Sequence, residues 1–117
     1  MSEKERLQQE IMAQLKDYSD KALLGARTLL LELRGQRKPD TDELLNLVIA
    51  GINWEIEVFN HCEQLINKDF ARVDKSKMAI AVSRLGRILQ EKDDIKLAAA
   101  IEVDFIPFLT AMKQAAV

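Results

Sequence analysis

The side chains best suited to metal chemistry in this sequence are Glu57 and His61, the only histidine among 117 residues. They are four residues apart, so on a helix both point from the same face and could supply two metal ligands. The di-iron bundle pattern needs a Glu-x-x-His pair from each of two helices, and neither that spacing nor a second histidine is present. Both residues also share a face with the polar Asn53, Asn60 and Gln64. The pattern therefore indicates a solvated pair, and we expect no metal and no cofactor.

The only cysteine, Cys62, directly follows His61. Adjacent residues of a helix point about 100° apart, so these two cannot form a nucleophile–base pair. Cys62 lies instead at the centre of an apolar arc, where a buried thiol is inert. The sequence also lacks a phosphate-binding loop, a dinucleotide-binding glycine pattern, a nucleophile elbow and a zinc-ligand cluster. We expect no enzymatic activity, although a carboxylate pair could still converge from distant helices.

Glu55 is the charged residue that the helical pattern places on an apolar face, near Val48 and Val58. A carboxylate that faces a core needs a partner or a shifted pKa. Two alternatives remain open from the sequence. Either Glu55 faces the core, with a partner such as Arg27 or Arg84 or with a shifted pKa, or it lies at the lip of the fold.

Four segments carry apolar residues at helical spacing, and no segment alternates as a strand would. They are predicted to cover residues 4–34, 40–67, 74–90 and 93–113. Gly35 suits the position just after the first helix, and Pro39 prevents its continuation. Asp40 and Glu43 have the spacing of a capping box at the start of the second helix.

The third helix is predicted to begin near Asp74, or earlier near Phe70, and Asp93 is expected to cap the fourth. The link between these two helices is so short that they must be antiparallel neighbours. The sequence therefore predicts an all-α fold, a single domain over residues 1–117. The simplest arrangement is a four-helix up-down-up-down bundle with a long first helix.

Gly25 and Gly51 interrupt the apolar faces of the first and second helices. Glycine inside a helix costs about 1 kcal/mol relative to alanine, so a compensating gain is expected. Close approach of two helix backbones would provide it, and Ala22, Ala26 and Ala50 beside the glycines favour such a crossing. The alternative is that both glycines are merely tolerated.

Pro107 lies inside the fourth helical segment, and the apolar spacing continues across it through Phe105, Phe108 and Leu109. Proline cannot donate a hydrogen bond to the Val103 carbonyl, and its ring crowds that carbonyl. The fourth helix is therefore predicted to kink at Pro107.

The same helix carries a second apolar row, about 100° or more from its main stripe. The row consists of Ile95, Ala99, Val103 and Ile106. Large apolar patches on proteins usually mark an interface, and two-fold dimers are the commonest assembly. We expect this row to contact a second copy or another protein. The alternative is that the long first helix, through Leu24 and Leu31, covers it within one chain.

The formal net charge is −2, from 17 basic and 19 acidic side chains, so nothing pulls the chain toward nucleic acid. A mild basic stripe lies on and before the third helix, at Arg72, Lys75, Lys77, Arg84 and Arg87. No aromatic residues alternate with these charges, which favours a solvated face; an acidic protein partner is the alternative. We expect no nucleic-acid partner.

The first residues are polar, and no apolar run approaches the roughly 18 residues of a membrane span. The single cysteine excludes an internal disulfide and is typical of a reducing compartment. The sequence therefore predicts a cytoplasmic protein that does not enter a membrane.

One spacing on the last helix is similar to that of an uncharacterised family of small all-helical bacterial proteins. It comprises Asp94, Ala98, Glu102, Pro107 and Leu109, and it follows the Gly-Ile-Asn-Trp of residues 51–54. No activity belongs to that family, so the resemblance implies no catalytic residue. It implies a bacterial, cytoplasmic protein.

These observations favour a non-catalytic protein-interaction module, self-associating or acting as a small helical chaperone or regulator that holds a partner helix. The alternative is a helical bundle that binds a ligand or a metal between its helices.

Overall fold

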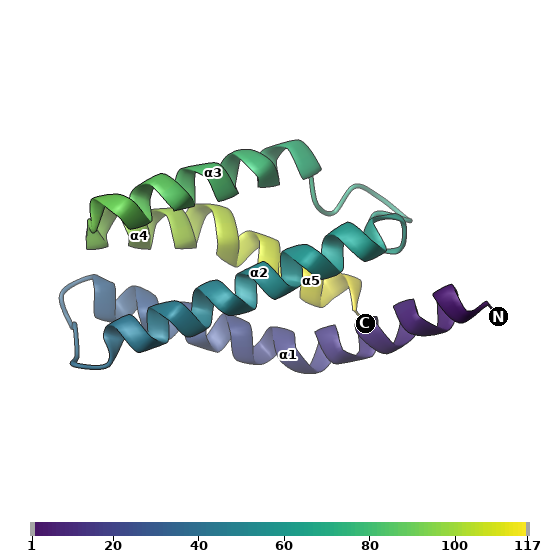
Figure 1. Cartoon of the computed structure of the whole chain (residues 1–117), viewed down its shortest axis with the longest axis horizontal. Helices are drawn as coiled ribbons and strands as arrows, with labels where there is room; N and C mark the ends of the chain where they lie inside the picture. Colours follow the sequence, from purple (N-terminus) through teal and green to yellow (C-terminus); the bar gives the residue numbers. More distant parts are fainter. Residues whose placement is uncertain (1, 117) are drawn as a thin grey trace.

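The computed structural model describes residues 2–116, and every regular element in that range is a helix (Figure 1). The elements are α1 (Glu3–Leu33), α2 (Thr41–Ile66), α3 (Lys75–Glu91), α4 (Asp94–Ala100), the π-helical turn η1 (Ile101–Phe105) and α5 (Ile106–Ala115). The predicted all-α fold is therefore confirmed. Residues 1 and 117 of the predicted domain lie outside the described part of the chain.

The helices pack around one core. α1 and α2 lie side by side, α5 packs against both, and α4 packs against α1 (Figure 1). α3 packs against α4 and η1, and it makes no comparable contact with α2. The largest fully buried apolar side chains come from α1, α2, η1 and α5: Leu15, Leu29, Ile52, Phe59, Ile66, Ile101, Phe105, Leu109 and Met112. α3 is thus attached to the bundle mainly through the last helices.

Acidic side chains cap two helices, at Asp93 as predicted and at Asp74, where only the start of the helix was predicted. Asp74 accepts a hydrogen bond from the Lys77 N–H, and Asp93 accepts from the N–H groups of Ile95 and Lys96. Each carboxylate satisfies N–H groups that have no partner inside the first turn of its helix.

The predicted capping box at the start of α2 is wrong. Asp40 has φ −101° and ψ 12°, outside the extended conformation of a typical N-cap, and its side chain makes no capping bond. The hydroxyl of Thr41 takes part instead: its Oγ1 accepts from the Lys38 N–H at 2.8 Å and donates to Glu32 Oε1 at 2.7 Å. Glu32 and Thr41 are both buried, so this pair fixes the α1–α2 connection.

The close approach at Gly51 involves a side chain rather than a second backbone. A Cβ atom at position 51 would collide with the hydroxyl of Tyr18 from α1. A Cβ at Gly25 would lie 3.6 Å from Val48 Cγ2, an ordinary contact. Of the two glycines expected at a crossing, only Gly51 is required by its surroundings.

The last helical segment is interrupted in front of Pro107. In η1 the Ile106 N–H bonds to the carbonyl of Ile101, five residues earlier, and Pro107 follows in the first turn of α5. A proline ring crowds the carbonyl four residues before it, which here belongs to Val103. A wider turn moves the ring and that carbonyl apart. The pattern predicted a kink at Pro107, but it did not predict that the interruption would be a π turn.

Candidate functional site

The outer side of α4 and η1 exposes large apolar side chains. Ile95 is 67% exposed, Val103 is 68% exposed, and Ala99 between them is exposed as well. We call these three residues the outer row. Ile106, the fourth residue of the predicted row, is half-buried and packs against the core. Within residues 2–116, nothing covers the outer row.

The core uses the opposite side of the same helix. Leu97, Ala98, Ile101 and Phe105 are at most 5% exposed. A helix with two apolar sides can direct only one of them into a single core, so the other faces outward. The alternative that α1 covers the outer row does not hold in the structure, because Leu24 and Leu31 are themselves 68% and 61% exposed.

Ion pairs join the last helices to α1. The Arg34 guanidinium donates to both carboxylate oxygens of Glu102, at 3.0 and 3.1 Å, and Lys113 pairs with Asp20 at 2.6 Å. Leu24 and Leu31 lie between Asp20 and Arg34 at helical spacing. The exposed leucines of α1 therefore border the same side of the molecule as the outer row.

An ion pair also joins η1 to α3, where Arg84 donates to Asp104 at 2.9 Å. Beside it a shallow cavity of about 290 Å³ lies between α3 on one side and α4 and η1 on the other, and its lining includes Ile88, Ala99 and Val103. The outer row therefore borders a shallow cavity.

Glu55 is fully buried, with 0% of its surface exposed. Its Oε1 accepts a hydrogen bond from the Ser19 hydroxyl of α1 at 3.4 Å, and its Oε2 has no partner. Burial raises the pKa of Glu55 from 4.5 to about 8, and the hydrogen bond from Ser19 offsets only part of this effect. The carboxyl therefore carries its proton at neutral pH.

Glu55 faces the core with a raised pKa, as the first alternative allowed, and it does not lie at the lip of the fold. Neither of the suggested cations reaches it, because Arg84 pairs with Asp104 and Arg27 is exposed. The partner is Ser19, a polar residue within the buried stripe of α1. That position on the stripe was the available sequence signal, but it does not say which helix would face it.

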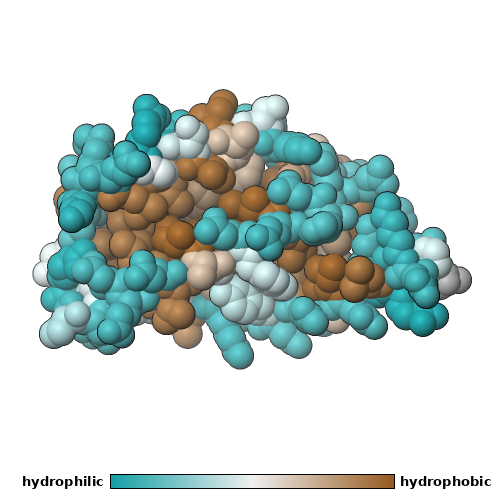
Figure 2. Space-filling view, in the orientation of Figure 1, coloured by the Kyte–Doolittle hydropathy of each residue, from teal (hydrophilic) through white to brown (hydrophobic). Residues whose placement is uncertain are grey.

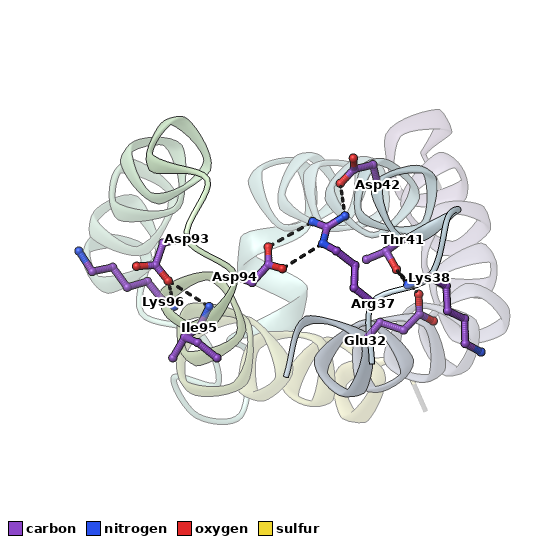
Figure 3. A network of polar contacts seen from close by, with 9 residues as sticks. All are labelled: Glu32, Arg37, Lys38, Thr41, Asp42, Asp93, Asp94, Ile95 and Lys96. Atoms are coloured by element: carbon purple, nitrogen blue, oxygen red, sulfur yellow. Dashed lines mark hydrogen bonds and ion pairs between the residues drawn. The ribbon is translucent and has the colours of Figure 1, made fainter. Parts of the chain in front are cut away.

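A second polar cluster closes one end of the molecule (Figure 3). The Arg37 guanidinium, from the α1–α2 connection, bonds both oxygens of Asp94 at 3.0 and 3.2 Å and Asp42 at 2.9 Å. Arg37 holds the pKa of Asp94 below its usual range through this hydrogen bond. The cluster ties the start of α4 to the start of α2, and the pairing of Arg37 with Asp94, 57 residues away, was not predicted.

Apolar atoms gather on the face that Figure 2 presents, between α3 and α2. At the end closed by Arg37, a cavity of about 510 Å³ has Leu45, Leu89 and Leu97 among its lining residues. Charges of both signs, including Asp42 and Lys92, line the same cavity, so its rim selects no particular partner.

A third hollow lies on the seam between α1 and α2. Its volume is about 500 Å³, and its lining includes Tyr18, Leu47, Gly51 and Trp54. The rings of Tyr18 and Trp54 meet edge to face, with centroids 5.2 Å apart and planes at 70°. Leu47 is 68% exposed at its border. The two rings and Leu47 give one side of this cavity the apolar surface that small-molecule sites use.

The residues first considered for chemistry are not brought together. Glu57 and His61 are exposed, and Cys62 is buried, where desolvation raises the pKa of its thiol. Among residues 2–116, no three His, Cys, Asp or Glu side chains form a group that could hold a metal ion. No helix in this range combines the length and apolar character required to cross a bilayer.

Comparison with known proteins places the chain in a family without supplying an activity. No curated protein and no solved structure matches it. A family described as a domain of unknown function (DUF8042) matches residues 10–115, nearly the whole described chain. This confirms the resemblance to an uncharacterised family, while a bacterial origin stays a prediction. The chain belongs to this family, the domain of unknown function DUF8042.

Proposed function

We propose that the chain is a non-catalytic protein-interaction module that binds its partner through the outer row. The observation that carries the proposal is the exposure of Ile95 and Val103, at 67% and 68%, on a helix whose other side is fully used by the core. Burying a large aliphatic side chain is worth roughly 1.5–3 kcal/mol, so an uncovered row favours association.

The surroundings of the outer row support an interface rather than an isolated exposed residue. Leu24 and Leu31 extend the apolar surface along α1, and the ion pairs Arg34–Glu102 and Arg84–Asp104 flank it. An apolar centre with a charged rim is the usual composition of a protein interface. We propose a cytoplasmic location, which the single buried cysteine and the charge balance support.

A photo-crosslinking amino acid tests this proposal when it replaces Val103 in the producing cell. We expect one discrete protein adduct, lost when Ile95→Glu is added. Ser83, exposed on α3, is the matched control position and is expected to give no adduct. Equal background labelling from positions 103 and 83 would overturn the proposal.

The cavity between Tyr18 and Trp54 favours a second candidate, a bundle that binds an apolar small molecule on the α1–α2 seam. Native mass spectrometry of protein purified without chelator distinguishes the two functions. A retained ligand, lost in Trp54→Ala, would support the second candidate. A ligand-free protein supports the interaction module.

A further inference from the structure

We infer that the cavity between the start of α3 and the start of α5 binds an acidic segment of the partner protein. An apolar side chain of that segment enters the cavity, and a carboxylate beside it meets the cations at the rim. The inference rests on the proposed function and names the chemistry of the partner. It follows from the basic stripe on and before α3, which the outer row leaves unexplained.

Some cations of the basic stripe are already paired within the fold. Arg84 donates to Asp104 at 2.9 Å, and Lys75 lies 3.6 Å from Glu63. Arg87 is exposed on α3 and is not among the residues that line the cavity. The stripe is therefore not one uniform solvated face.

Arg72 and Lys77 are the members that line the cavity. Within residues 2–116, neither side chain forms an ion pair with a carboxylate. Arg72 is also half-buried, so its guanidinium has lost part of its hydration without gaining an anion. A half-buried cation in this state favours a negatively charged partner.

The cavity beside these cations has a volume of about 360 Å³ and an apolar floor. Met78, Ala81 and Phe108 line it and are at most 9% exposed, so the floor is part of the core. The exposed ring of Pro107 forms a further part of the lining. The cavity thus offers an apolar side chain a place next to two cations.

The two carboxylates that line the cavity are occupied. Asp74 accepts a hydrogen bond from the Lys77 N–H at 3.0 Å, where it caps α3, and Asp104 accepts from Arg84. Together with Arg84, the cations Arg72 and Lys77 outnumber these two carboxylates. The charge at this rim is therefore positive, which complements an acidic segment.

Arg72 is held in place before a partner arrives. Its Cζ atom lies 4.2 Å from the centroid of the Phe70 ring. The Asn67 side chain bonds both the N–H and the carbonyl of the neighbouring Val73, at 3.1 and 3.0 Å, which fixes the connection between α2 and α3. A guanidinium fixed in this way can bond a carboxylate through two N–H groups and loses little conformational freedom on binding.

The cavity continues the surface proposed for the partner. Asp104 lines both this cavity and the shallow cavity beside the outer row, so the two hollows follow one seam between α3 and the last helices. An extended segment that contacts Val103 can reach Arg72 and Lys77 along this seam. This continuity favours a protein segment over a free small carboxylate.

Selection from a displayed library of random peptides on the immobilised full chain tests the inference. We expect enrichment of peptides that carry Asp or Glu next to a large apolar residue. A labelled synthetic copy of an enriched peptide, measured by fluorescence polarisation, should bind about fivefold or more weakly to Arg72→Gln and to Lys77→Gln. Arg87→Gln removes the same charge outside the cavity and is the matched control, which should bind as the wild type does. Circular dichroism of each variant establishes that it is folded.

Changes in the peptide separate the two parts of the site. Replacing its carboxylates with amides should abolish the difference between the wild type and Arg72→Gln. Replacing its large apolar residue with glycine should weaken binding to the wild type about tenfold. A glycine peptide that binds equally well would show attraction between charges alone and would refute the proposed site.

A selection without acidic peptides, or binding that is insensitive to Arg72 and Lys77, would overturn the inference. A discrete adduct from position 103 would leave the proposed function standing in that case. Acidic peptides that depend on Arg72 and Lys77, without an adduct from position 103, would instead overturn only the role of the outer row.

Discussion

Replacing Glu55 with glutamine is expected to remove a large pH dependence from the stability of the fold. The carboxyl has a pKa of about 8 in the folded chain, against 4.5 for an ordinary glutamate, because burial disfavours its charged form. The folded state therefore binds more protons than the unfolded state between these two values. The contribution of Glu55 to stability is greatest below pH 4.5, falls as the pH rises, and reaches its lower limit above pH 8.

The expected loss follows from the distance between the two pKa values. At pH 7 the unfolded chain has released the proton and the folded chain has not, which lowers the free energy of unfolding by about 3 kcal/mol. Above pH 8 the loss approaches roughly 5 kcal/mol, a large part of the stability of a small domain. Within residues 2–116, Ser19 is the only group that bonds the carboxyl, so no cation there compensates when the proton leaves.

Urea unfolding at pH 5, 7 and 9 measures the effect. The free energy of unfolding of the wild type should fall across this series. For Glu55→Gln this fall should be absent, because position 55 no longer carries a group that titrates. The amide leaves a buried donor unpaired at a cost of about 1–3 kcal/mol, which is independent of pH and therefore separable. Glu57→Gln, exposed on the same helix, is the control and should keep the slope of the wild type. A wild type without that slope, or a Glu55→Gln variant that retains it, would refute the reasoning.

Three further outcomes are expected. Gly51→Ala should lower the free energy of unfolding in urea by about 1–3 kcal/mol, because the added methyl collides with the Tyr18 hydroxyl. Adding Tyr18→Phe should recover part of this loss, and a double variant without recovery would contradict the proposed cause. Pro107→Ala restores an N–H opposite the Val103 carbonyl, so hydrogen exchange should detect a protected amide at position 107; rapid exchange there would show that the π turn does not depend on the proline. Chelator should leave the helical circular dichroism and the melting temperature unchanged, since no metal-binding group was found among residues 2–116; a substantial drop would contradict this.

Helices and their ends were predictable where the information is local. The apolar spacing that predicted a helix over residues 4–34 corresponds to α1, Glu3–Leu33, because periodicity and the Gly35 stop act within a few residues. Asp93 was predictable as a cap for the same reason. That Asp40 would not cap α2 was not predictable. The hydroxyl of Thr41 takes part there instead, and its bond to Glu32 forms only because the turn brings these two residues together.

The site depends on distances between segments, and these were the part that could not be predicted. Glu55 was recognised as anomalous, but the identity of Ser19 as its partner depends on the rotation of α1 against α2. The exposure of Ile95 and Val103 required knowing that Leu24 and Leu31 of α1 do not cover them. A single sequence specifies two apolar sides of a helix and does not say which of them the fold will cover.

The contact between Tyr18 and Trp54 makes the seam between α1 and α2 visible to fluorescence. The chain has one tyrosine and one tryptophan, and their ring centroids are 5.2 Å apart. At this separation light absorbed by the tyrosine is passed to the tryptophan, so the folded chain should emit almost entirely as tryptophan. Separation of α1 from α2 would restore tyrosine emission. The protein therefore carries its own optical reporter of this seam, which needs no added dye.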